Sequence, residues 1–279
     1  MNIPKASSKL QEVIDFYSES AIFGRLAAST QKDYDIHLAA VCKTVVEGKA
    51  LGDYRHKNIK VRHLTQAYEA WLSVGIRTAN YRKTVLATAW KHSMRHDVMT
   101  HNPVALVQAK SGQQRRVLWS TDQVQKFLSV AYGDFRWRSI GLIVHMAYDW
   151  GQRVGDMRVL KWDKLDLTQC RMDITQRNAE VHLPISAGLC DMLRQQKEDF
   201  GFQEYVAPRV KPRTNAYPPY DKIEISSLIN DVLAEAKLPM TLTAMDLRRT
   251  AVTEMMEGGV DIAGIMQVTG HKDIGSVKP

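Results

Sequence analysis

The chain has 279 residues, of which 44% are hydrophobic and 24% charged, and its formal net charge at pH 7 is +8. This composition indicates a globular protein with two domains, and it excludes a disordered or low-complexity chain. No apolar run approaches the roughly 20 residues needed to cross a bilayer, so we expect a cytoplasmic protein without membrane contact. The positive charge favours a polyanionic partner.

The three cysteines are few and far apart in the sequence. Cys42, Cys170 and Cys190 are odd in number and form no spacing typical of a metal-ligand pair. We therefore expect small, reduced core residues, with neither a disulfide nor a structural zinc site.

The excess of positive charge lies in the first part of the chain. Residues 1–110 contain 16 Lys and Arg against 9 Asp and Glu, and the remainder contains 22 against 21. We expect the electrostatic attraction for a polyanion to come mainly from this first part.

Residues 1–109 show helical periodicity and no strand-like alternation, which predicts a helical domain. Expected helices cover 10–17, a segment capped near Ser29 that runs to Val45, about 63–74, and about 78–97. In the last of these, an apolar stripe leaves four basic side chains outward, and they are candidate DNA contacts: Arg82, Lys83, Lys91 and Arg95. The alternative is an ordinary solvated helix face.

A polar, basic segment over 110–117 predicts a linker between two domains. It follows the helix-breaking pair Asn102–Pro103 and contains Arg115 and Arg116, which are further candidate DNA contacts. The second domain is therefore expected over 118–279.

The second domain is predicted to be mainly helical with one small antiparallel sheet. A capping-box pattern over 120–123 precedes a helix, and an apolar helix over 140–148 is expected to be buried. Three β-rich runs at 165–167, 171–175 and 181–185 predict the sheet, and helices are expected at 186–196, 226–236, 247–257 and 262–268. The fold class is thus mainly α with a small antiparallel β-sheet.

The first cluster with chemical potential follows the apolar helix. A turn at Gly151 leads into a short helix that places Arg153 and Asp156 three residues apart, on one face. Asp156 is expected to hold Arg153 in position. An ordinary surface ion pair is the alternative.

The second cluster lies in a predicted helix that begins at Asp246, a suitable N-cap. Arg248 borders the apolar face of this helix, where a guanidinium is poorly solvated unless an anion joins it, and its planar fork suits phosphate oxygens. Arg249 points elsewhere, toward solvent or a DNA backbone. Paired arginines on a helix also occur for purely structural reasons.

The third cluster is a glycine and a histidine after the last predicted helix. Gly270 supplies a left-handed helix end and delivers His271 just beyond it. Alone, such a histidine is more typical of a cap or a solvent-exposed residue.

Together the three clusters resemble the catalytic domain of the tyrosine site-specific recombinase, or phage integrase, family. The resemblance rests on the order Gly151–Asp156, a small hairpin, Leu247–Thr250 and Gly270–His271, while the helical first part is similar to the family's core-binding domain. It implies an integrase that cuts and rejoins DNA through a 3′-phosphotyrosyl intermediate, without metal or other cofactor. A phage enzyme that integrates a viral genome in the bacterial cytoplasm or nucleoid is the expected type.

The resemblance also implies roles for individual residues. Arg153 and Arg248 would stabilise the phosphate in the transition state, His271 would hydrogen-bond it, and Asp156 would support the site.

The sequence departs from the family pattern at three positions. Met245 occupies the position of a family histidine, and the hairpin that usually holds a lysine contains Arg177 as the nearest substitute. The nucleophilic tyrosine would fall directly after Pro279, and no tyrosine follows Tyr220. We therefore expect this chain, which ends before the nucleophile, to bind DNA without cleaving it.

The expected partner is a double-stranded DNA attachment site, held by contacts with its phosphates. The intact protein would form a homotetramer on DNA, and the free chain would be a monomer. Two alternatives stay open: a degenerate recombinase that only binds DNA as a regulatory protein, and an unrelated helical protein that binds an acidic protein.

Overall fold

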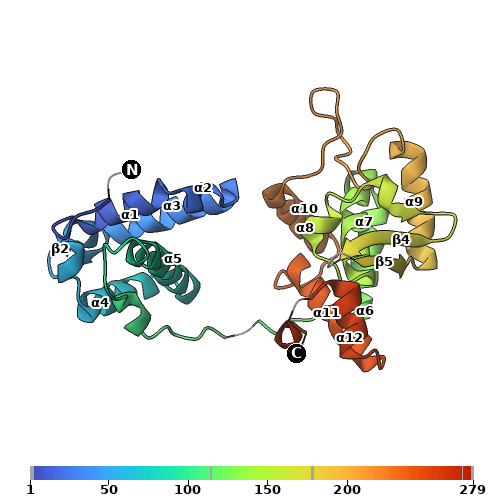
Figure 1. Ribbon diagram of the computed structural model, residues 1–279. Helices are drawn as coiled ribbons and strands as arrows, with labels where there is room; N and C mark the ends of the chain where they lie inside the picture. Colours follow the sequence, from blue (N-terminus) through green and yellow to red (C-terminus); the bar gives the residue numbers. More distant parts are fainter. Residues whose placement is uncertain (1–2, 114, 177–178, 272, 278–279) are drawn as a thin grey trace. The chain divides into compact units, whose positions relative to one another are not determined.

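The computed structural model describes residues 3–113, 115–176, 179–271 and 273–277, and they form two compact units, Met1–Gln114 and Arg115–Pro279 (Figure 1). Both units are mostly helical, and each contains one small antiparallel sheet. The predicted fold class is confirmed. Within the described residues, no helix is both long and apolar enough to cross a membrane.

The first unit is built around one long helix, α5, which packs against α1, α3 and α4. Its core contains leucines from these helices, with Leu10, Leu38 and Leu86 fully or almost fully buried. The helices are α1 Leu10–Ser18, α2 Ala21–Gly24, α3 Ala28–Lys43, α4 Val61–Leu72 and α5 Ile76–Met94. The predicted helices are therefore present, with ends displaced by a few residues.

The expectation that the first part contains no strand is wrong. Strands β1 Val45–Val46 and β2 Lys49–Ala50 form an antiparallel hairpin. Its turn places Glu47 and Gly48 at φ of 48° and 77°, the left-handed conformation that suits a tight hairpin. Two-residue strands are too short to produce a visible alternation, and the helix expected to reach Val45 ends two residues earlier.

The second unit surrounds a central helix, α7, which packs against α6, α8, α9, α10 and α11. Almost every side chain from Ile140 to Ala147 is buried, as expected for a central helix. The helices are α6 Thr121–Gly133, α7 Phe135–Asp149, α8 Val154–Met157, α9 Ala187–Phe200, α10 Lys222–Glu235, α11 Ala244–Glu257 and α12 Ile262–Thr269. The predicted capping box is present, since Ser120 Oγ accepts from Gln123 N and Gln123 Oε1 accepts from Ser120 N.

The three-stranded sheet has the order β3-β4-β5, with all pairs antiparallel. Its strands are β3 Leu165–Asp166, β4 Arg171–Gln176 and β5 Ala179–Pro184. Met172 pairs with Leu165 on one side and with Leu183 on the other, and it is fully buried. Short 3-10 turns lie at Leu51–Asp53, His56–Asn58, Pro103–Leu106, Trp162–Lys164 and Ile274–Ser276.

The expectation of three reduced cysteines is wrong for two of them. Cys170 and Cys190 form a disulfide with 5.9 Å between their Cα atoms, whereas Cys42 is free and buried. Cys170 lies in the turn before β4 and Cys190 in the first turn of α9, so the antiparallel sheet returns the chain to its starting edge and brings the two together. Their sequence separation of 20 residues gave no indication of this proximity.

Candidate active site

The turn between α7 and α8 places Arg153 at the surface of the second unit. Gly151 has φ of +58°, and a Cβ there would lie 3.0 Å from Cγ2 of Thr269, so a glycine suits both the backbone and the space. The next residue, Gln152, is buried, and its Nε2 donates to the carbonyls of Trp150 at 3.2 Å and Val268 at 2.6 Å. These contacts fasten the turn to the end of α12.

Arg153 and Asp156 do not form the expected ion pair in the part of the chain that the structure describes. Arg153 is the backbone N-cap of α8, and both side chains are exposed. Two exposed side chains gain little from pairing because water screens them. Both charges still act on Arg248, since Arg153 lowers and Asp156 raises the pKa of that guanidinium.

Helix α11 begins three residues earlier than the sequence indicated, and Asp246 is not its N-cap. Thr243 is the N-cap, and Asp246 occupies the third helical position of a capping box in which its Oδ2 accepts from Thr243 N. Leu247 and Ala251 are buried as expected. Arg248 follows Leu247 and lies at the edge of this apolar face, half-buried.

Arg248 is the centre of the candidate site. Its Nη1 donates to the carbonyl of Gly151 at 3.1 Å, and its Nε donates to His271 Nε2 at 3.2 Å. Its Nη2 is buried and has no hydrogen-bond partner among the described residues. Burial, followed by the charge of Arg153, lowers the pKa of Arg248 to about 10, so the group stays protonated at neutral pH. A buried cationic N–H without an acceptor is costly, and an anion is the partner that would satisfy it.

His271 is held from both sides. Gly270 ends α12 in the predicted left-handed conformation, with φ of 71°. Thr269 Oγ1 lies 2.6 Å from the Ile265 carbonyl and 2.6 Å from His271 Nδ1. Because the hydroxyl donates its one proton to the carbonyl, it accepts from Nδ1–H. Nε2 is then the acceptor of the bond from Arg248, which fixes the tautomer.

The structure therefore brings Arg248 and His271 into contact and places Arg153 close enough to lower the pKa of Arg248. Sequence reasoning missed Gln152 and Thr269, whose buried side chains hold the Gly151 turn and His271 in place. The only signal of their roles was that each is a polar residue directly beside a motif residue, Gly151 or Gly270. Among the described residues no group of three or more His, Cys, Asp or Glu could hold a metal ion.

Met245 and Arg249 are further predicted residues on the helix that carries Arg248. Met245 is 84% exposed on α11, and Arg249 is exposed on the same helix. Arg177 lies outside the described residues. Arg115 is bound through its side chain to Asp246, and Arg116 is exposed.

Three of the four basic candidates of the first unit lie on α5, and Arg95 is the residue that caps its C-terminus. Lys91 and Arg95 are exposed one turn apart, and Lys83 is half-exposed. Arg82 lies near His37 of α3. Burial lowers the pKa of His37, and the charge of Arg82 lowers it further.

Sequence comparisons place Arg153, Arg248 and His271 within a known domain type. The model of the phage integrase family matches residues 118–279. Tyrosine recombinase XerC of Anoxybacillus flavithermus is 21% identical over 217 residues, which cover 72% of this chain and 70% of that protein. XerC of Bacillus pumilus is also 21% identical, over 227 residues that cover 77% of this chain and 73% of that protein.

Similar folds are found among solved structures. A lambda integrase dimer bound to a COC′ core site is 18% identical, with a TM-score of 0.77 over 98% of this chain and 78% of that chain. The Tn1549 transposon integrase in complex with a circular intermediate DNA is 15% identical, with a TM-score of 0.78 over 97% of this chain and 94% of that chain. At these identities the likeness is one of fold.

Proposed function

Because the chain belongs to the phage integrase family, we propose that Arg153, Arg248 and His271 hold a DNA phosphate during site-specific strand cleavage and rejoining. The observation that carries this proposal is the buried Nη2 of Arg248, which has no partner among the described residues. An anion at this position would accept a hydrogen bond from Nη2. The positive charge of Arg153, which is near enough to lower the pKa of Arg248, would also attract that anion. A non-bridging phosphate oxygen has the charge and size that such a group recognises.

The proposed reaction is a transesterification. A tyrosine oxygen attacks phosphorus, the bond from phosphorus to the 5′ oxygen breaks, and the protein is left with a 3′-phosphotyrosyl link. The tyrosine loses a proton and the leaving 5′ oxygen gains one. Negative charge grows on the non-bridging oxygens during the attack, and the guanidinium groups of Arg248 and Arg153 would stabilise it there.

The other roles rest on correspondence with the family pattern. The nucleophile would follow Pro279, and Arg177 would steady the leaving oxygen, since a guanidinium stays protonated. Asp156 would support the arginines through its charge. Met245 can neither donate nor accept a proton usefully, so this position would contribute nothing to proton transfer.

DNA is proposed to be held mainly through its phosphates. Basic side chains on both units would contribute: Arg82, Lys83, Lys91, Arg95, Arg116 and Arg249. Log affinity falls as log salt concentration rises, and each phosphate contact should make this negative slope steeper by about 0.9. A lambda integrase tetramer bound to a Holliday junction has a similar fold, which supports the proposal of a tetramer on DNA. The free chain is proposed to be a monomer.

A second candidate is a DNA-binding protein without recombinase activity. It is favoured by Met245, an exposed apolar side chain where the family places a histidine. The type of DNA is a separate part of the proposal, and an attachment site for a phage genome is the substrate proposed, since the matching family is that of the phage integrases.

A nicked suicide substrate distinguishes recombinase from binding protein. The 279-residue chain and a version extended beyond Pro279 through a tyrosine are each mixed with DNA carrying a candidate attachment site. A covalent protein–DNA band on a denaturing gel is expected with the extended chain, and it should vanish when Arg248 is replaced by Ala. DNA binding without a band from either chain would support the binding protein instead.

A further inference from the structure

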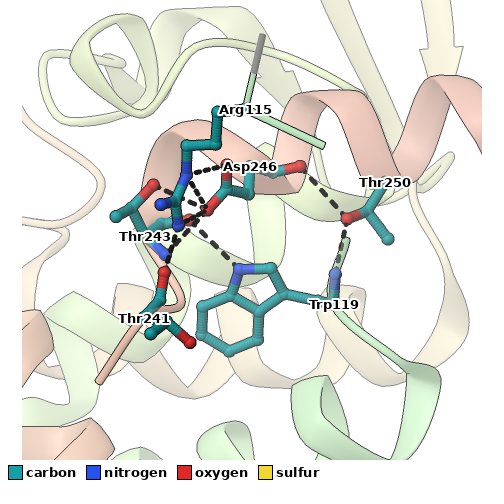
Figure 2. Close-up of polar contacts among 6 residues, drawn as sticks. All are labelled: Arg115, Trp119, Thr241, Thr243, Asp246 and Thr250. Atoms are coloured by element: carbon teal, nitrogen blue, oxygen red, sulfur yellow. Dashed lines mark hydrogen bonds and ion pairs between the residues drawn. The ribbon is translucent and has the colours of Figure 1, made fainter. Parts of the chain in front are cut away.

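Arg115 is the first residue of the second unit and lies in the segment predicted to join the two units, residues 110–117. Its side chain bonds to residues at the start of α11 (Figure 2). Its Nε donates to Oδ1 and Oδ2 of Asp246 at 2.9 and 3.2 Å, and its Nη2 donates to Oδ2 at 2.7 Å. Nη2 also donates to the carbonyl of Thr241. A guanidinium that engages both oxygens of a carboxylate forms the strongest geometry available to such a pair.

The carboxylate of Asp246 depends on this arginine. The Asp246 side chain is only 5% exposed, whereas that of Arg115 is 45% exposed. Burial by itself raises the pKa of Asp246, but the bonds from Arg115 and from Thr243 outweigh it and hold the pKa below its usual value. If Arg115 turned away to bind a phosphate, a buried charge would lose its counter-ion.

A second set of bonds to the same helix comes from Trp119, two residues after the joining segment. The backbone N–H of Trp119 donates to Thr250 Oγ1 at 3.0 Å, and its indole Nε1 donates to the Thr243 carbonyl at 3.1 Å. Thr250 Oγ1 in turn donates to the Asp246 carbonyl at 3.1 Å. Figure 2 shows these bonds gathered around the first turns of α11.

The helix that receives these bonds also carries Arg248. Asp246 and Arg248 are two residues apart, and on an α-helix this separation rotates the side chains by about 200°. Arg115 therefore holds one side of α11 while Arg248 contacts Gly151 and His271 from the other side.

We propose that Arg115 is a positioning residue, which ties the joining segment to the start of α11 and so holds Arg248 in place for the phosphate. The proposal rests on the function proposed above, because it needs Arg248 to bind the scissile phosphate. It gives Arg115 a different role from the DNA contact expected from its charge.

The test compares two variants that break the same ion pair, Arg115→Ala and Asp246→Asn. In the chain extended through a tyrosine, each should lower the rate of covalent complex formation at saturating DNA by at least tenfold. In the 279-residue chain, neither should change the slope of log affinity against log salt. Rates are measured well below the unfolding temperature of each variant, so that lost stability alone does not lower them.

Two further variants serve as references. Arg136→Ala removes an exposed arginine paired with Asp134 at the start of α7, a matched pair outside the site, and it should change neither quantity. Arg116→Ala should make the negative salt slope shallower by about 0.9, the value for one phosphate contact.

A second readout does not depend on cleavage. The NMR signal of Arg248 Nε–H, which donates to His271, should move in Arg115→Ala and Asp246→Asn and stay in place in Arg136→Ala. If the unaltered extended chain forms no covalent complex, the proposed function fails, and the signal alone decides the positioning role.

Two results would overturn the proposal. In the first, Arg115→Ala reduces the salt dependence of DNA binding as Arg116→Ala does and cleaves normally at saturating DNA, which would make Arg115 a DNA contact. In the second, both variants cleave normally with unaltered salt dependence, or, if the unaltered extended chain does not cleave, the Arg248 signal does not move. The ion pair would then be a purely local contact.

Discussion

The hydroxyl of Thr269 offers a sharp test of how the site is held together. Thr269 is 1% exposed, and its Oγ1 accepts from His271 Nδ1–H while donating to the Ile265 carbonyl. Thr269→Val keeps the shape of the side chain and removes this acceptor. His271 then loses the contact that fixes its tautomer and ring orientation.

The expected loss follows from the two bonds removed, one to the Ile265 carbonyl and one from His271. A net intramolecular hydrogen bond contributes about 1 kcal/mol, so the free energy of unfolding should fall by about 1–2 kcal/mol. If the same energy is lost from the transition state, covalent complex formation should slow by roughly tenfold, since about 1.4 kcal/mol corresponds to a factor of ten.

The assay uses the chain extended through a tyrosine, with rates taken at saturating suicide DNA and stability taken from urea unfolding. Thr269→Ser is the control, because it keeps the hydroxyl and should stay within about twofold of the unaltered rate. Imidazole nitrogen shifts report the tautomer of His271 directly. A valine variant with an unaltered rate and tautomer would refute the reasoning.

Three further predictions concern stability. Gly151→Ala places an alanine in the left-handed conformation and brings its Cβ against Thr269. The free energy of unfolding should fall by about 1–2 kcal/mol, and the cleavage rate of the extended chain should fall by at least tenfold. An unaltered urea midpoint would contradict this. Reducing the Cys170–Cys190 disulfide should cost about 3 kcal/mol by releasing a loop of moderate length, and dithiothreitol should leave the double serine variant unaffected. Burial, followed by the charges of its neighbours, lowers the pKa of His92, so the unfolded chain takes up a proton before the folded one. His92 should therefore make stability fall as pH drops below about 6.5, contributing at most about 1.4 kcal/mol per pH unit. In urea titrations His92→Phe should reduce this dependence and leave the part due to His37 and His145, whose pKa values burial also lowers.

The sequence by itself determined the local elements and the identity of the central groups. Apolar periodicity located α7, the capping box located the start of α6, and Gly270 marked the end of α12. These features depend on residues within one or two turns of each other, so they are readable without knowledge of the fold. The hairpin of β1 and β2 was missed because two-residue strands leave no pattern.

Only the tertiary structure decided which groups meet. Arg248 donates to the Gly151 carbonyl across 97 positions of sequence, and Gln152 donates to Val268 across 116. Arg115 was expected to face DNA, yet it bonds to Asp246, 131 positions away. Charge and spacing indicate that a side chain needs a partner, but the choice between water, phosphate and a buried carboxylate depends on which surfaces packing brings within about 3 Å.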